Sequence, residues 1–242
     1  MTATRIYAPA SYTPEATLAL PDAARDHLRA RRLRPGDSLT VFDGAGASAE
    51  ARLEHLDKRG AQARIVRLAE GDPAAALPIT LVQGMGKGDA MDIVVQKATE
   101  LGVASVRPVY TDNAVVRLKG DRAVRKQEHW QRIAISACEQ CGRNTLPSVA
   151  SPQTLADATA AMATVQGVVI TADAARGMGS LARPGGPMVL AVGPEGGFSH
   201  REIERLTGAG WQACRLGPRV LRMETAAIAG LTAIGLLFGD LG

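Results

Sequence analysis

The stretch MVLAVGPEGGFSH, residues 188–200, decides the fold. Its first five residues are all apolar, which predicts a buried strand over 188–192. The run ends at Gly193-Pro194, and Ser199 followed by Glu202 has the spacing of a helix capping box. A buried strand, a glycine-rich loop and a helix in this order indicate an α/β domain.

The same alternation continues through the C-terminal two thirds of the chain. We expect strands over 79–82, 106–110, 167–171, 188–192 and 213–216, and helices over 90–101, 122–141, 201–208 and 223–238. Such an order predicts a mostly parallel sheet. Residues 1–70 instead contain short strands (5–8, 38–42, 49–56 and 61–68) and one helix (21–32), which suggests a small barrel. The stretch 71–78 looks like a linker, so we predict domains over 1–72 and 73–242.

Composition and charge narrow the class of protein. The chain has 242 residues, 46% of them hydrophobic, and no apolar run is long and clean enough to span a bilayer. Its start lacks a signal-peptide core, so we expect a cytoplasmic protein. Basic residues crowd into 25–34 and again into 117–126, in a chain of net charge +4. One cluster alone would suggest a solvated face, but two favour a nucleic-acid partner.

Cysteine and histidine usage argues against metal chemistry. Cys138 and Cys141 form a CxxC without a second pair, inside a helical pattern, so a packing role is favoured over redox or zinc binding. The four histidines are scattered without ligand spacing. We expect no metal.

Two loops of the predicted α/β domain are the candidate ligand-binding segments. The first, 193–197, holds three glycines and Glu195; the second, 216–222, again follows a strand with Gly-Pro before a helix. Ligands of open α/β sheets gather at the carboxyl ends of strands, and glycine lets the backbone approach them closely. A cofactor pocket made from loop backbone is therefore expected. Gly84-Met85-Gly86-Lys87-Gly88 is a weaker signal, since it lacks the P-loop spacing, and a flexible loop is favoured there.

These motifs carry a family resemblance. GPEGGFS at 193–199 with LGPRVLRMETAA at 216–227 resembles RNA methyltransferases with a knotted α/β domain, the SPOUT superfamily. More narrowly, the chain is similar to the ribosomal small subunit methyltransferase E family, which methylates N3 of a uridine in 16S rRNA. MDIVVQKATELGV at 91–103 and CEQCGRNTLP at 138–147 support it, and HLRARRLRPGDSLTVFDG at 27–44 resembles that family's PUA-like barrel. The chain departs from the family pattern at Met223, at Cys141 and in TDNAVVRL at 111–118.

The resemblance implies a C-terminal trefoil-knotted domain after a PUA-like RNA-binding barrel. It further implies a homodimer that binds 16S rRNA or the small ribosomal subunit, and S-adenosylmethionine bound by the knot loops. The cofactor-binding residues it implies are Val192, Gly193, Glu195, Gly196, Gly197, Leu216, Gly217, Val220, Leu221, Arg222, Thr225 and Ala226.

The implied reaction is an attack by uracil N3 on the sulfonium methyl group. Neutral N3 carries a proton, so alignment and charge stabilisation are the protein's tasks. Candidate catalytic residues are Arg143, Glu139 and Arg222, and candidate RNA-binding residues are Arg29, Arg31, Arg32, Lys87, Lys97, Gln140, Arg143 and Asn144. For Glu195, bracing of the loop is favoured over a general-base role.

Several alternatives remain open at this stage. Residues 139–144 could be no more than an exposed polar helix end, and Lys97 could simply form an ion pair with Glu100. At the level of the whole protein, one alternative is a non-catalytic RNA-binding module with a vestigial cofactor pocket. A nucleotide-dependent oxidoreductase is supported only by Gly84-Met85-Gly86 and the lone CxxC.

Overall fold

The structure is a computed structural model that describes residues 1–242 except 1–3, 73–76, 119, 161 and 163. It contains two compact units. The small unit comprises Met1–Ala74 with Ile135–Leu146, and the large unit comprises Ala75–Ala134 with Pro147–Gly242. Helix α3 (Asp121–Cys141) therefore contributes to both. The predicted boundary between 72 and 73 adjoins residues 73–76, which lie outside the described part, and stays a prediction.

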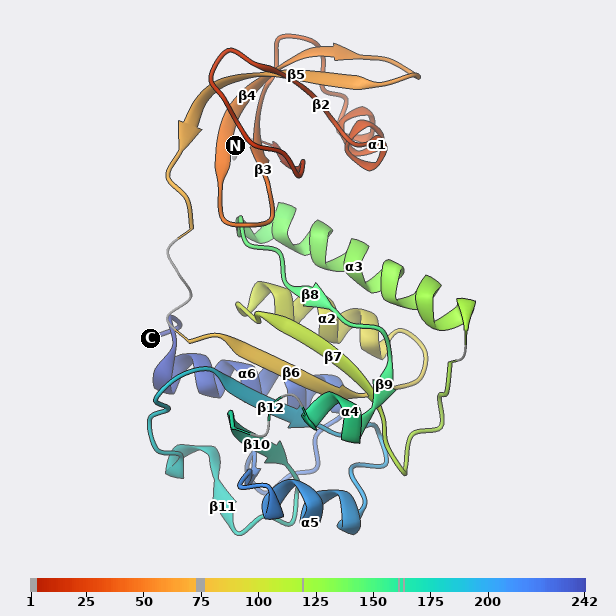
Figure 1. Ribbon diagram of the computed structural model, residues 1–242, viewed down its shortest axis with the longest axis vertical. Helices are drawn as coiled ribbons and strands as arrows, with labels where there is room; N and C mark the ends of the chain where they lie inside the picture. The colour runs from red at the N-terminus through yellow and green to blue at the C-terminus, as the bar shows by residue number, and fades with distance from the viewer. Residues whose placement is uncertain (1–3, 73–76, 119, 161, 163) are drawn as a thin grey trace. The chain divides into compact units, whose positions relative to one another are not determined.

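The small unit is a five-stranded sheet folded around an apolar core (Figure 1). Its elements are β1 (Thr4–Tyr7), β2 (Thr17–Ala19), α1 (Asp22–Ala30), β3 (Ser38–Phe42), β4 (Ser48–Leu56) and β5 (Ala61–Ala69). The strand order is β1-β3-β4-β5-β2, with β1 parallel to β3 and the other pairs antiparallel. In β5 the buried residues Ala61, Ala63 and Ile65 alternate with exposed ones, as a half-buried strand requires. Helix α1 adds Ala24 and Leu28 to the core.

The large unit is a parallel α/β sheet. After β6 (Ile79–Gly84) come α2 (Ala90–Glu100), β7 (Ser105–Tyr110), α3, β8 (Ser148–Val149), β9 (Gln153–Thr154), α4 (Leu155–Ala160), β10 (Gln166–Ile170), β11 (Arg176–Gly177), the 3₁₀ turn η1 (Met178–Ser180), β12 (Met188–Val192), α5 (His200–Gly208), β13 (Gln212–Arg215) and α6 (Met223–Phe238). The order is β11-β13-β10-β12-β6-β7-β8, with β9 also paired to β7, and every pair is parallel.

The packing on both faces of strand β12 explains why its sequence is apolar throughout. Val189 and Ala191 belong to a core cluster that includes residues of α4 and α5. On α6, a Cβ added at Gly230 would lie 2.9 Å from the Leu190 side chain, so helix and strand pack closely there. Helix α6 also packs against α2. Both faces of β12 are covered, which is the environment that a continuous apolar run indicates.

The elements expected from sequence are present, and the predicted strand 188–192 and helix 223–238 agree residue for residue with β12 and α6. The helix expected over 21–32 ends at Ala30, because Arg32 adopts a left-handed φ of 59°. Short elements that the sequence did not predict are β2, β8, β9, α4, β11 and η1. Among the described residues, no helix is long and apolar enough to cross a membrane.

Candidate active site

Three loops meet at one edge of the parallel sheet. Strands β13, β10 and β12 are neighbours in that order, so their carboxyl ends lie side by side. The loops that follow them enclose a cavity of about 300 Å³, at the lower end of the range of ligand pockets, roughly 300–1,000 Å³. Its lining residues are Ile170, Thr171, Ala172, Asp173, Val192, Gly193, Pro194, Glu195, Gly196, Gly197, Phe198, Leu216, Gly217, Arg219, Val220, Leu221, Met223 and Ala226.

Glycine is required where the loops after β12 and β13 turn. Gly197 and Gly217 have φ values of 67° and 87°, a region that residues with a Cβ rarely adopt. Gly193 is needed for a different reason. A Cβ placed there would lie 2.8 Å from the carbonyl carbon of Gly197 and 2.9 Å from the backbone nitrogen of Phe198. The three glycines thus shape the backbone wall of the cavity.

Glu195 braces one loop against another. Its Oε1 accepts a hydrogen bond of 2.8 Å from the backbone N–H of Lys87, in the loop after β6. This geometry agrees with the bracing interpretation and explains the role of a carboxylate among glycines. Lys87 itself is exposed. The glycine-rich loop at 84–88 therefore supports the cavity through its backbone.

A second brace comes from the segment after β7. Asn113 Nδ2 donates to the carbonyl oxygens of Gly196 at 3.0 Å and Gly197 at 3.3 Å. The predicted capping box is confirmed, since Ser199 and Glu202 exchange hydrogen bonds of 3.2 and 2.8 Å. Glu202 also accepts from the backbone N–H of Asp112 at 2.9 Å. The loop after β12 is held on both sides.

The structure brings most of the predicted cofactor-binding residues together. Ten of the twelve line this cavity, namely Val192, Gly193, Glu195, Gly196, Gly197, Leu216, Gly217, Val220, Leu221 and Ala226. Arg222 and Thr225 are exposed near the start of α6 and do not line it. Sequence reasoning missed the third loop, 170–173. Its signal was Asp173, a carboxylate that follows closely on a buried parallel strand.

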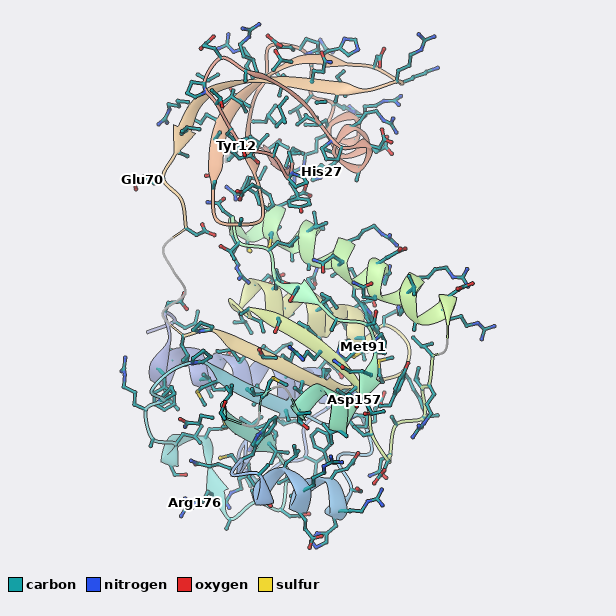
Figure 2. The ribbon with its side chains drawn as sticks, viewed as in Figure 1. Tyr12, His27, Glu70, Met91, Asp157 and Arg176 are labelled. Carbon is teal, nitrogen blue, oxygen red and sulfur yellow. The ribbon has the colours of Figure 1, made fainter. Side chains whose placement is uncertain are left out.

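Four further predicted residues lie in the small unit, and three of them have described partners there. Glu139 on α3 accepts from the Tyr7 backbone N–H, and its other oxygen lies 3.1 Å from Nδ1 of His27 (labelled in Figure 2). Asn144 is buried, and its amide oxygen accepts from Arg5, as does the backbone oxygen of Arg143. Gln140 is exposed on the same helix. These contacts give Glu139 and Asn144 structural roles, and the catalytic or RNA-binding roles of all four stay predictions.

The remaining predicted RNA-binding residues are spread over both units. Arg29, Arg31 and Arg32 are exposed at the end of α1 in the small unit. Lys97 on α2 forms the expected ion pair, with its Nζ 2.9 Å from Oε1 of Glu100. Their roles in RNA binding stay predictions.

The two cysteines of the CxxC differ, and only Cys138 packs in the interior. Cys138 is fully buried, and burial raises the pKa of its thiol to about 12. Cys141 is exposed. Among the described residues there is no group of three or more His, Cys, Asp or Glu side chains arranged to hold a metal.

Comparison with known proteins places this architecture in a family. A model described as an RNA methyltransferase domain matches residues 73–235, and one described as an RNA methyltransferase PUA domain matches residues 20–66. The chain belongs to the ribosomal RNA small subunit methyltransferase E family. The family member from Mycobacterium bovis is 32% identical over 86% of this chain and 81% of its own length.

Two solved structures share the fold over the whole chain. The member from Neisseria gonorrhoeae, bound to S-adenosyl methionine, is 39% identical with a TM-score of 0.95, over 100% of both chains. A putative methyltransferase from Legionella pneumophila, also in complex with S-adenosyl methionine, is 35% identical with a TM-score of 0.91 over 100% of both chains. The predicted fold class, a SPOUT-type α/β domain with a PUA-like N-terminal domain, is confirmed.

Proposed function

We propose that the protein transfers a methyl group from S-adenosylmethionine to N3 of a uridine in the 16S rRNA of the small ribosomal subunit. The observation that carries this proposal is the cavity at the carboxyl ends of β10, β12 and β13, which is lined mainly by residues of the loops that follow these strands. Membership of the family supports the reaction and its rRNA substrate.

The residues around the cavity fit this cofactor. Val220 is apolar yet 87% exposed, and it lines the cavity beside Leu221, where an adenine face would cover it. Asp173 and Glu195 supply carboxylates at the opposite loops, suited to hydroxyl and ammonium groups. An open cavity with exposed apolar lining argues against the alternative of a vestigial pocket, which side chains would fill. When bound, S-adenosylmethionine supplies an electrophilic methyl group.

The protein's own task is to position uracil and manage its N3 proton. N3 becomes a strong nucleophile only as it loses that proton, so a cation that stabilises the developing negative charge speeds the reaction. Arg222, the N-cap residue of α6, is next in sequence to the cavity residues Leu221 and Met223. We assign this role to Arg222; a catalytic role of Arg143, which lies in the small unit, stays a prediction from the family resemblance. Glu195 is engaged as a brace, and we assign it no proton transfer.

The activity is tested with small ribosomal subunits from a strain that lacks this gene. With radiolabelled S-adenosylmethionine, the protein should label the rRNA, and mass spectrometry should locate the methyl group on N3 of one uridine. Cofactor binding without label on naked 16S rRNA or on assembled subunits would refute the proposal. RNA binding without transfer would instead support the non-catalytic alternative.

The role of Arg143 is tested by Arg143→Ala. We expect unchanged S-adenosylmethionine affinity by calorimetry and a loss of methyl transfer of roughly 10²–10³-fold, the usual effect of removing a group that stabilises developing charge. Arg183→Ala, at an exposed position of the large unit that does not line the cavity, is the matched control. Equal activity of Arg143→Ala and the control would remove Arg143 from the mechanism.

We further propose that the protein works as a homodimer in the cytoplasm. Support comes from α6, where Leu236 and Leu237 are 57% and 42% exposed near the C-terminus, and from Ile93 on α2, which is 43% exposed. Exposed apolar side chains on two packed helices are suited to a subunit interface. Sedimentation equilibrium should give twice the chain mass, and a monomer at micromolar concentration would contradict this part of the proposal.

A further inference from the structure

A second cavity in the large unit has an apolar floor and a cationic rim. Its volume is about 360 Å³. Met85, Met91 and Trp130, all buried, lie at its floor, with Val116 and Leu118 beside them. Arg122, Arg125 and Lys126 of α3 complete the lining. Met91 is labelled in Figure 2. We call this the Trp130 cavity.

The floor of the Trp130 cavity is held rigidly by Asp92. Trp130 Nε1 donates to Asp92 Oδ1 at 3.0 Å, His129 Nε2 lies 2.6 Å from Oδ2, and Lys126 Nζ lies 3.2 Å from Oδ1. Partial burial alone would raise the pKa of Asp92, but the hydrogen bonds and charges of His129 and Lys126 outweigh it and hold this pKa below its ordinary value. The carboxylate is thus already engaged by donors of α3.

The two arginines at the rim of the Trp130 cavity are not neutralised by neighbouring carboxylates in the described part of the chain. Arg122 and Arg125 are exposed, and neither forms an ion pair with any carboxylate among the described residues. Lys126 lies 5.5 Å from the centre of the Trp130 ring, beside the carboxylate of Asp92. Two unpaired guanidinium groups above an apolar floor fit a ligand with one flat apolar part and one anionic part. A nucleotide has this chemistry, since its base is flat and its phosphate pairs well with arginine.

Further arginine side chains lie between the Trp130 cavity and the loops that line the first cavity. Arg122 and Arg125 also line a hollow with Arg117 and Asp121. Arg117 in turn lines a hollow with Arg201 and Arg205, in which Asp112 is paired with Arg201 and Glu202 accepts from backbone N–H groups. This cationic track passes along residues 111–118, the segment whose Asn113 holds the loop 193–197. An RNA strand on this track would therefore run beside the proposed methyl-transfer cavity. The hollow with Arg201 and Arg205 also includes Thr111, whose buried Oγ1 has no partner among the described residues.

We propose that the Trp130 cavity binds one unstacked base of the RNA substrate, with the adjoining phosphates held by Arg122 and Arg125. The inference rests on the proposed function, because that function makes the ligand an RNA. It adds a second nucleotide site, separate from the site of the uridine that is methylated. Recognition at two bases would let the protein select its target by the structure around it.

The base contact is tested by filling the cavity. Val116→Trp places a bulky ring in the Trp130 cavity, whereas Val115→Trp, at a neighbouring residue that is 72% exposed and does not line it, is the matched control. The probes are a fluorescein-labelled oligoadenylate and an abasic strand of the same length and charge, measured by fluorescence anisotropy. Val116→Trp should weaken binding of oligoadenylate roughly fivefold or more, the scale of losing one base contact, and leave the abasic strand unchanged.

The phosphate contact is tested by the double variant Arg122→Glu with Arg125→Glu. It should weaken both strands and reduce the slope of log affinity against log salt by about 1.4, since each phosphate contact to single-stranded RNA contributes about 0.7. Arg176→Glu with Arg183→Glu, at two exposed positions away from the track, makes the same change in net charge and is the control. An unchanged slope in the double variant would overturn the assignment.

The two proposals fail in different ways. Calorimetric affinity for S-adenosylmethionine should stay as in the wild type for the cavity variants, which separates the Trp130 cavity from the cofactor site. If the protein never transfers a methyl group but shows this pattern of RNA binding, the Trp130 cavity stands without the enzyme function. The base pocket would be contradicted if Val116→Trp weakened binding of the oligoadenylate and of the abasic strand equally. It would also be contradicted by a changed oligomeric state with unchanged RNA affinity.

Discussion

Gly193→Ala is the most informative single change at the first cavity. The added methyl group would lie 2.8–2.9 Å from three backbone atoms of Gly197 and Phe198. Backbone atoms cannot rotate away as a flexible side chain can. The turn is closed by a 2.8 Å hydrogen bond from Gly197 N–H to the Pro194 carbonyl oxygen, so this turn must open or carry the strain.

The magnitude follows from the usual cost of an overpacked site, about 1–3 kcal/mol. For a chain of this length each kcal/mol lowers Tm by roughly 2–4 °C. If the loop relieves the overlap by opening, returning to its ligand-binding conformation costs the same free energy as the strain. Affinity for S-adenosylmethionine should then fall roughly 5- to 150-fold, because every 1.4 kcal/mol corresponds to about a factor of ten.

Isothermal titration calorimetry measures the affinity and differential scanning calorimetry the Tm. Gly185→Ala is the control, because a Cβ at that exposed glycine would meet no atom within 4 Å. It should bind S-adenosylmethionine as the wild type does. Wild-type affinity in Gly193→Ala would refute the reasoning that the backbone of this loop forms the cofactor site.

Two more predictions concern other parts of the chain. Ellman's reagent at pH 8 should label one of the three thiols rapidly, because Cys141 is exposed, whereas Cys138 and Cys214 are buried and burial raises the pKa of both; rapid labelling of a Cys141→Ser variant would contradict this. Asp92→Asn should lower the free energy of unfolding by about 1–3 kcal/mol in denaturant titrations at pH 7, because the charge-assisted hydrogen bonds from His129 and the Trp130 floor lose their carboxylate. The pKa of Asp92 is held below its ordinary value, so its contribution is present above about pH 4 and lost as the pH falls through the folded-state value. The difference between variant and wild type should therefore shrink in acid, and a constant difference would contradict the assignment.

Sequence patterns predicted the large unit well because its signals are local. The strand at Met188–Val192 is bounded by proline on one side and Gly-Pro on the other, so both its length and its burial can be read from the run itself. The two glycine-bearing loops were expected together because carboxyl ends of neighbouring parallel strands share one edge. The order of the strands, with β10 between β12 and β13, is a long-range property that brought in the loop 170–173 as well.

The small unit shows what local patterns miss. Nothing in the helical periodicity of 122–141 indicates that its last turns belong with a sheet built from residues 4–69. Those turns are joined to it by single side chains, such as Glu139, which accepts from the Tyr7 backbone N–H across 132 positions of sequence. Asp72 accepts from the backbone N–H groups of Asn144 and Thr145 in the same way. Pairings between residues so far apart in sequence depend on the tertiary structure, and helical periodicity does not predict them.

The composition of the small unit has a consequence for the order of folding during synthesis. Chains emerge N-terminus first, and compact parts usually fold as they appear. The apolar core of this unit comes from residues 6–65, but the unit also includes Ile135–Leu146, so its completion must wait until more than half of the polypeptide has been made. During that wait the edge of β1 and the Asp72 carboxylate lack the partners that complete them. Translation speed through the intervening segment should therefore influence how much of the newly made protein reaches its final form.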